Sequence, residues 1–152
     1  MAATEQAQGV PTGLSHVALR VRNLDRAVKF YTEVVGLALR NRRDAAAFLG
    51  VRPDTSHELA LFALGDDAEK ADADRAGMYH AAWEMASFED LERLHERLLA
   101  SGAHITGYSD RACNVMFFDP DENELEAFWE PPRDVLARAR EPGGPSLPRL
   151  KR

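Results

Sequence analysis

The strongest constraint on this sequence is a weak internal repeat with an offset of 64 residues. The segment Gly13-Leu-Ser-His16 returns as Gly77-Met-Tyr-His80. Later in each half, Glu58-Leu-Ala-Leu-Phe62 is echoed by Glu124-Leu-Glu-Ala-Phe128. Each half also has an alternating segment followed by an amphipathic helical one and further strand-like segments. The repeat therefore predicts an α+β fold of two tandem βαβββ modules.

The two halves predict the same order of elements. Apolar residues at helical spacing predict two helices, with Asn23 and Ser87 as N-caps and Gly36 and Gly102 at the helix ends. Alternating patterns predict strands at about 14–21, 45–49, 58–64, 79–85, 115–118 and 124–130. One domain is expected at 13–130, with modules at about 13–64 and 77–130 joined by an exposed acidic loop at 65–75. Residues 1–12 are expected to be disordered, and 131–152 to form a tail with one short helix at 133–140.

Composition and charge exclude several classes of protein. The 152 residues, 45% of them hydrophobic, suit one compact domain. The net charge of −6 argues against a nucleic-acid-binding surface. Cys113 is the only cysteine, so no intrachain disulfide can form, and we interpret it as a packing residue. The N-terminal residues do not resemble a signal peptide and no apolar run reaches the length of a membrane span, so we expect a soluble cytoplasmic protein without nucleic-acid or membrane partners.

His16 and His80 occupy matched positions in the two halves, on the strand face opposite the apolar stripe. If the first strands of the modules pair across the repeat, both side chains can converge, and Glu126 can complete a set of two histidines and one carboxylate. Such a facial triad leaves coordination positions open for substrate and suits Fe(II), with Mn(II) also feasible. The alternative is that each histidine is merely packed or solvent-facing, and the pattern by itself leaves both interpretations open.

Three stretches of the chain resemble a known superfamily. The stretches 13–31 and 34–37 look like the opening of the vicinal-oxygen-chelate superfamily of glyoxalases, bleomycin-resistance proteins and extradiol dioxygenases. Asp119-Pro-Asp-Glu-Asn-Glu-Leu-Glu126 is similar to its closing motif, in which the last glutamate binds metal. The resemblance covers about 13–130 and implies a cleft of mixed sheet with His16, His80 and Glu126 in the ligand positions.

The repeat offers a test of which reaction the superfamily resemblance implies. Glyoxalase-I-type sites use a fourth ligand at the first-module counterpart of Glu126, and aligning the repeats puts Ala60 there. Unless Glu58 substitutes through a shifted register, the three-ligand plan of extradiol dioxygenases and fosfomycin-modifying transferases is favoured. The segment Ser56-His57-Glu58-Leu-Ala-Leu61 resembles the part of extradiol dioxygenases that carries an acid–base histidine beside the metal. His57 is then the expected catalytic residue, provided that a bend turns it to the face of Ala60.

The expected activity is therefore that of an Fe(II)-dependent extradiol dioxygenase acting on a catechol-type aromatic substrate with O2, in a homodimer. The chain departs from that pattern at Met116, where such enzymes carry tyrosine, at Glu122 in place of a turn glycine, and in lacking a loop histidine. The alternatives are a glyoxalase-like lyase, an epimerase, a fosfomycin-type thiol transferase, or an antibiotic-binding resistance protein; the last does not need the ligand triad. His95 is expected on the solvated face of the second helix without a partner.

Overall fold

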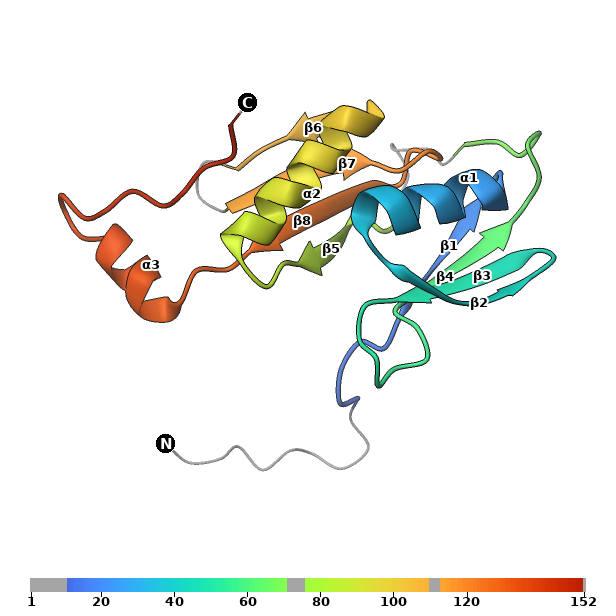
Figure 1. Ribbon diagram of the computed structural model, residues 1–152, viewed down its shortest axis with the longest axis horizontal. Coiled ribbons are helices and arrows are strands. Elements are labelled where there is room, and N and C mark those ends of the chain that lie inside the picture. The colour runs from blue at the N-terminus through green and yellow to red at the C-terminus, as the bar shows by residue number, and fades with distance from the viewer. Residues whose placement is uncertain (1–10, 71–75, 110–112, 152) are drawn as a thin grey trace.

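The chain forms two four-stranded mixed sheets, each with a helix on one face, in the computed structural model (Figure 1). The structure describes residues 11–70, 76–109 and 113–151, so most of the segment 1–12 and part of the loop 65–75 lie outside it. The elements are β1 (Val17–Val21), α1 (Leu24–Lys29), η1 (Phe30–Val35), β2 (Ala38–Arg43), β3 (Ala46–Gly50), β4 (Leu59–Ala63), β5 (Ala81–Glu84), α2 (Phe88–Ser101), β6 (Ile105–Gly107), β7 (Cys113–Phe118), β8 (Glu124–Trp129) and α3 (Arg133–Ala139).

The two sheets have the same topology. Their strand orders are β1-β4-β3-β2 and β5-β8-β7-β6. The pairs β1–β4 and β5–β8 are parallel, and the other neighbouring pairs are antiparallel. The predicted α+β fold of two βαβββ modules is confirmed. The sequence missed β2, a fully exposed edge strand, and the three-residue β6, because neither has a core-facing alternation long enough to detect.

The helix boundaries follow the predicted capping residues. The side chains of Asn23 and Ser87 each accept a hydrogen bond from the backbone N–H three residues on. Gly36 and Gly102 end the helices with φ of 98° and 71°, a left-handed conformation that glycine adopts without steric penalty. The first helix differs from the prediction, because its α-helical part ends at Lys29 and the π-helix η1 continues it to Val35.

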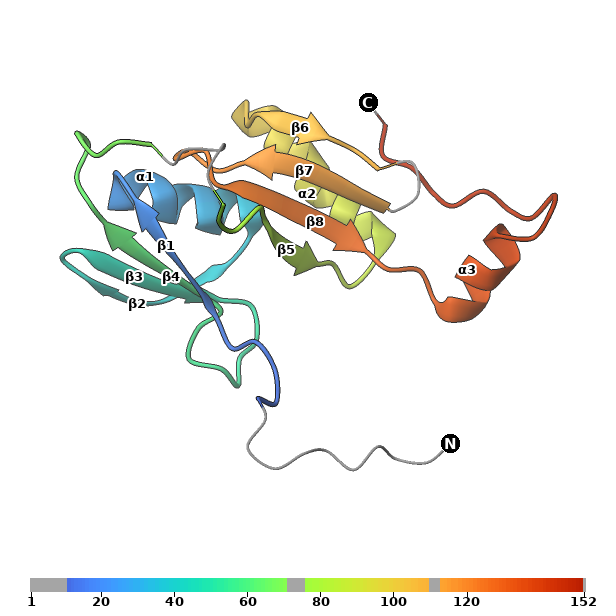
Figure 2. The same cartoon turned by 180° about the vertical axis from the view of Figure 1, so that it is seen from behind.

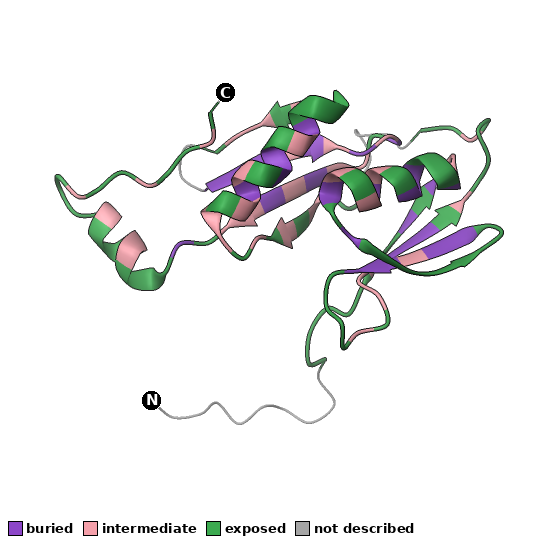
Figure 3. Ribbon diagram, viewed as in Figure 1, coloured by how far each residue is buried: buried purple, intermediate pink, exposed green. Residues whose placement is uncertain are grey.

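One face of each sheet is packed and the other is open. Figures 1 and 2 show α1 and α2 on the same side of the molecule, with both sheets uncovered when seen from behind. In the first sheet the edge strand β2 is exposed throughout, whereas the inner strands β3 and β4 are largely buried (Figure 3). The core contains the residues that face the helices, among them Leu19, Val21, Leu49, Leu59, Leu61, Leu91, Leu94, Leu98, Val115, Phe117 and Leu125. The core therefore lies mainly between the helices and the sheet faces that they cover.

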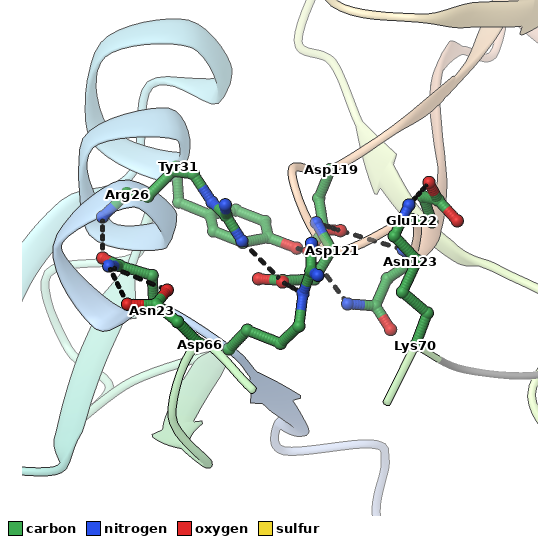
Figure 4. A network of polar contacts seen from close by, with 10 residues as sticks. Asn23, Arg26, Tyr31, Asp66, Lys70, Asp119, Asp121, Glu122 and Asn123 are labelled. Atoms are coloured by element: carbon green, nitrogen blue, oxygen red, sulfur yellow. Dashed lines mark hydrogen bonds and ion pairs between the residues drawn. The ribbon is translucent and has the colours of Figure 1, made fainter. Parts of the chain in front are cut away.

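The Asp-Pro-Asp turn between β7 and β8 joins the two modules (Figure 4). The fully buried Tyr31 of η1 donates its hydroxyl to Asp119 Oδ2 at 2.9 Å. Arg22 and Arg26 both donate to Asp121 Oδ1, at 3.0 and 2.8 Å. Burial raises the pKa of Tyr31, and the charge of Asp119 raises it further, so the phenol remains a donor at neutral pH. These contacts fix the position of one module relative to the other.

The C-terminal segment follows the second module. The predicted short helix is confirmed as α3, and beyond it Leu147 and Leu150 pack against the core. Cys113 is buried, its thiol donates to the Pro148 carbonyl at 3.4 Å, and burial raises its pKa, in keeping with a packing role. Across the described residues, every helix is too short or too polar to traverse a bilayer.

Candidate metal centre

His80 and Glu126 meet on the open face of the second sheet. His80 immediately precedes β5, which pairs in parallel with β8, and the register places Ala82 opposite Glu126. His80 Nε2 lies 3.2 Å from Glu126 Oε2. Two ligands that bind one metal at about 2.0–2.2 Å and a right angle would lie about 3 Å apart, so this pair fits adjacent positions of one coordination sphere.

Two further contacts orient that pair. Asn114 Nδ2, from the adjacent strand β7, donates to Glu126 Oε1 at 2.5 Å and leaves Oε2 directed at His80. The other ring nitrogen of the histidine, His80 Nδ1, is buried and has no hydrogen-bond partner among the described residues. The same holds for Trp83 Nε1 and Asp121 Oδ2, so this feature is not specific to His80.

His16 and His57 meet on the open face of the first sheet. Their ring centroids are 4.6 Å apart, and the ring of Phe48 lies 5.0 Å from that of His57. The bend that His57 needs in order to share a sheet face with Ala60 is present. Residues 51–58 contain turns and bends, and β4 begins only at Leu59. Ser56 Oγ lies 3.0 Å from His57 Nδ1, so the hydroxyl engages this ring nitrogen.

The strand register supports the alignment of Ala60 with Glu126. Ala18 is opposite Ala60 in the first module, just as Ala82 is opposite Glu126 in the second. Ala60 is 1% exposed and offers no ligand atom. The first module therefore has no fourth ligand at the position that the repeat assigns to it.

The carboxylate of Glu58 is occupied by hydrogen bonds within its own loop and is not available as a substitute ligand. Its carboxylate accepts hydrogen bonds from the Arg52 guanidinium, the Thr55 hydroxyl and the Val51 backbone N–H, at 2.7, 2.5 and 2.9 Å. Burial alone raises the pKa of Glu58, but the three hydrogen bonds and the charge of Arg52 outweigh that effect and lower it to about 2. Glu58 thereby closes the loop that precedes β4 and carries His57.

The three predicted metal ligands do not gather in one place within the described part of the chain. Among the described residues, no group of three or more His, Cys, Asp or Glu side chains is arranged to hold a metal. Instead, His80 and Glu126 form a pair in the second module, and His16 lies beside His57 in the first. The metal site therefore remains a prediction, for which the chain presents two half-sites on two sheets.

Sequence reasoning missed two polar positions. Asn114, which orients Glu126, occupies a strand position with no motif around it, and only the strand register reveals its role. The expectation for His95 was wrong: it is 4% exposed, and its Nε2 lies 2.8 Å from the Tyr108 hydroxyl. The helical pattern placed His95 beside the apolar stripe of α2. The contact with Tyr108, which lies in the segment after α2, could not be predicted from that pattern.

The comparisons with known proteins identify the family. Residues 13–127 match the model of the Glyoxalase/Bleomycin resistance protein/Dioxygenase superfamily, and the chain belongs to it. It is 35% identical over 128 residues to the lactoylglutathione lyase GLX1 of Arabidopsis thaliana, covering 77% of this chain and 44% of that protein. It is 28% identical to catechol-2,3-dioxygenase of Bacillus subtilis, covering 86% of this chain and 46% of the relative. The chain thus spans less than half the length of these two curated relatives.

A solved structure supports the same assignment. The glyoxylase/bleomycin resistance protein/dioxygenase domain from Frankia sp. EAN1pec is 31% identical, with a TM-score of 0.65, and the match covers 80% of this chain and all of that one. The superfamily includes both lyases and dioxygenases, so membership defines the fold and the kind of site but leaves the reaction open.

Proposed function

We propose that this chain is a metal-dependent enzyme that opens a catechol-type aromatic ring with O2, using Fe(II) or Mn(II) held by His16, His80 and Glu126. The observation that carries this proposal is the position of His57, whose ring lies 4.6 Å from that of His16. Alanine at position 60 supports it too, because a four-ligand lyase site would need a ligand atom there. Phe48 and Phe62, with ring centroids 6.2 Å apart on the same sheet, offer an aromatic surface to a planar substrate.

A bound divalent metal would supply positive charge that favours the ionised form of a catechol hydroxyl and an open position for a second small ligand. Within this chain, His57 is the group that accepts a proton from the substrate through Nε2, because Ser56 engages Nδ1. Glu58 and its three donors hold the loop that carries His57, so the imidazole keeps its place beside His16. Asn114 holds the Glu126 carboxylate in the orientation that faces His80.

We propose further that the metal site is completed between two copies of the chain in a homodimer. The half-sites lie on separate open sheet faces, and the docking of Tyr31 and Asp119 holds the two modules in this relation. A second copy related by a twofold axis can place its His80 and Glu126 opposite His16, and the same operation builds a second, identical site.

Mixing two defective chains tests this arrangement. His16→Ala and Glu126→Ala should each bind little metal alone. Unfolded together in equal amounts and refolded, they should recover about a quarter of wild-type metal content, since half of the dimers are mixed and each has one intact site. A mixture that stays as empty as its parents, with dimers present by sedimentation, contradicts the shared site; a monomeric mass contradicts the dimer.

The activity itself is tested with Fe(II), air and a set of simple catechols. The wild type should consume O2 and form a yellow ring-opened product. His57→Phe should keep bound metal but lose about 10²–10⁴-fold in turnover, roughly 3–5 kcal/mol of barrier. Ser56→Ala, which removes only the hydroxyl that contacts Nδ1 and keeps the imidazole, should reduce turnover far less. Equal turnover in His57→Phe and wild type would remove the acid–base role while leaving the metal site intact.

The second candidate is a glyoxalase-like lyase, which the similarity to the Arabidopsis lactoylglutathione lyase favours. Measuring turnover of a hemithioacetal with Ni(II) or Zn(II) supplied distinguishes the lyase from the dioxygenase. The alanine at position 60 and the engaged Glu58 predict negligible turnover. Robust lyase activity would displace the dioxygenase proposal.

A further inference from the structure

Two arginines lie in one row across the open face of the first sheet. Arg20 on β1 pairs with Phe62 on β4. Phe62 also pairs with Ala46 on β3, which in turn pairs with Arg43 on β2. Side chains at paired positions point to the same side of a sheet, and this side is the open one seen in Figure 2, because the adjacent Leu61 belongs to the core. A guanidinium therefore stands at each end of the row.

These two guanidiniums lack the oxygen acceptors that the other arginines of the first module have. Five of the seven arginines between residues 13 and 64 donate to a carboxylate or a backbone carbonyl: Arg22, Arg26, Arg40, Arg42 and Arg52. Arg20 and Arg43 are exposed, and neither side chain has a hydrogen bond or an ion pair among the described residues. Arg43 instead lies over the ring of Phe48, with Cζ 5.9 Å from the ring centroid. Stacking on a ring does not occupy the N–H donors of a guanidinium.

The sheet itself supplies no carboxylate to balance these charges. Residues 11–70 are described without a gap, so no undescribed residue lies within its strands or the loops between them. The strand registers place no acidic residue on the open face, which carries Ala18, Arg20, Asn41, Arg43, Ala46, Phe48, Ala60 and Phe62. Asp25 pairs with Arg42 on the helix side, and Glu58 is held within its own loop. Asp44, in the turn between β2 and β3, makes no ion pair with either arginine of the row.

A series of rings connects the row to the histidines of the proposed site. Ring centroids are 4.6 Å apart between His16 and His57, and 5.0 Å apart between His57 and Phe48. The ring of Phe62 follows at 6.2 Å from that of Phe48. Arg20 comes four residues after His16, about 13 Å along an extended strand. An aromatic compound lying against these rings would thus direct a substituent away from the histidines and toward the guanidiniums.

The chemistry of this face favours a carboxylate on an aromatic body. A guanidinium binds a carboxylate through paired, charge-assisted hydrogen bonds that are stronger than neutral ones. The second module does not offer the same surface. There Glu84 is opposite Phe128, just as Arg20 is opposite Phe62 in the first module, so the repeat replaces the cation by an anion. Recognition of an acid is therefore a property of the first module alone.

We propose that the substrate is an aromatic compound with a carboxylate arm, and that Arg43 and Arg20 bind this arm. The inference rests on the proposed function, because it names the class of substrate for the same site. The hydroxyl-bearing end of the ring lies at His16 and His57, and the arm extends across Phe48 toward the row. Binding of the carboxylate fixes the orientation of the ring, so that its hydroxyls rather than its arm face the histidines.

Anaerobic calorimetry on the full, metal-free chain tests the arm without turnover. 3,4-Dihydroxyphenylacetate should bind at least about tenfold more tightly than 4-methylcatechol, which has the same ring and no carboxylate. Arg43→Gln should remove most of that difference and Arg20→Gln part of it, while binding of 4-methylcatechol changes little. Arg42→Gln is the matched control, because it removes the same charge from the next residue of β2, whose side chain pairs with Asp25 on the helix side.

Equal binding of the two catechols by the wild type overturns the assignment and leaves a carboxylate of a second copy as the occupant of the row. An equal loss in Arg42→Gln and Arg43→Gln overturns it as well, because the effect would then be one of overall charge.

Turnover with Fe(II) and air separates this inference from the proposed function. If 4-methylcatechol is opened with the same kcat/KM as 3,4-dihydroxyphenylacetate, the dioxygenase proposal stands and the carboxylate site fails. If the acid binds tightly through Arg43 but neither catechol is opened, the carboxylate site stands and the dioxygenase proposal fails.

Discussion

The open faces of the two modules differ in chemistry although their strands superpose in register. In the second module, Glu126 on β8 accepts a hydrogen bond from Asn114 on β7. The corresponding positions of the first module are Ala60 on β4 and Ala46 on β3. Both the carboxylate and its donor are thus replaced by alanine in one half of the repeat.

The pairing of these two replacements is informative. A carboxylate on a sheet face needs an orienting donor, and an amide there without the carboxylate would lose its partner, so the two positions are coupled. The first module instead places aromatic groups on its open face, with Phe48 opposite Ala60 and the ring of His57 against that of Phe48. One half of the repeat therefore presents a histidine beside an oriented carboxylate, and the other presents two histidines beside aromatic rings.

The largest effect is expected from exchanging the residues at the ligand position of the repeat. Glu126→Ala should abolish most metal binding, because it removes one of three proposed ligands. Ala60→Glu should not add a fourth ligand and should lower stability, because position 60 is 1% exposed and lacks the donor that serves Glu126. Metal analysis and thermal unfolding check both variants. Tighter metal binding by Ala60→Glu would show that the first module can still form a ligand position.

The next largest effect concerns the orienting amide. Asn114→Ala should weaken metal affinity by about 10–100-fold, as is usual when a group that orients a metal ligand is lost. Ala46→Asn, the reciprocal change in the first module, should leave metal affinity unchanged because no carboxylate stands opposite it. Competition with a metal chelator measures both affinities. Unchanged affinity in Asn114→Ala would mean that Glu126 needs no orienting partner.

A third comparison involves the glutamates that precede β4 and begin β8. Glu58 accepts three hydrogen bonds, whereas Glu124 accepts one, from Thr106. Glu58→Gln should therefore lower unfolding free energy at pH 7 by about 1–3 kcal/mol, and Glu124→Gln by less. Denaturant unfolding from pH 7 to pH 2 gives the comparison, and equal losses in the two variants would contradict it.

The pH dependence of that effect has a definite sign. The folded-state pKa of Glu58 is lowered to about 2, so its contribution is fully present above the unfolded-state value near 4.5. It is lost as the pH falls from about 4.5 through about 2. The difference in stability between wild type and Glu58→Gln should therefore shrink over that interval and stay constant above it.

The smallest effect is expected at the turn that joins β7 to β8. Glu122 has a φ of 66°, which is unfavourable for residues other than glycine. Glu122→Gly should relieve this strain and raise the free energy of unfolding by about 0.5–1 kcal/mol. Loss of the exposed ion pair between Glu122 and Lys70 would reduce that gain. Glu122→Ala, which loses the ion pair and keeps the strain, should not stabilise. Thermal unfolding distinguishes the two, and a less stable glycine variant would show that the ion pair dominates.

Local signals in the sequence determined the modular fold. The repeat of Gly13–His16 at Gly77–His80 can be read directly from the sequence. The caps at Asn23 and Ser87 and the stops at Gly36 and Gly102 are contacts between near neighbours. Their outcome depends on few residues, which is why they could be predicted. The sequence alone also indicated that position 60 lacks a ligand, since the period of a strand fixes which residues share a face.

Tertiary structure decided what those modules do with one another. The docking of Tyr31 on Asp119, the contact of His95 with Tyr108, and the bond from Asn114 to Glu126 join residues that are 88, 13 and 12 positions apart. No periodicity encodes such contacts, because each depends on how separately formed elements pack. The same packing separates His16 from His80 and Glu126 within one chain and leaves a cavity under the C-terminal segment, and neither outcome could be read from the sequence.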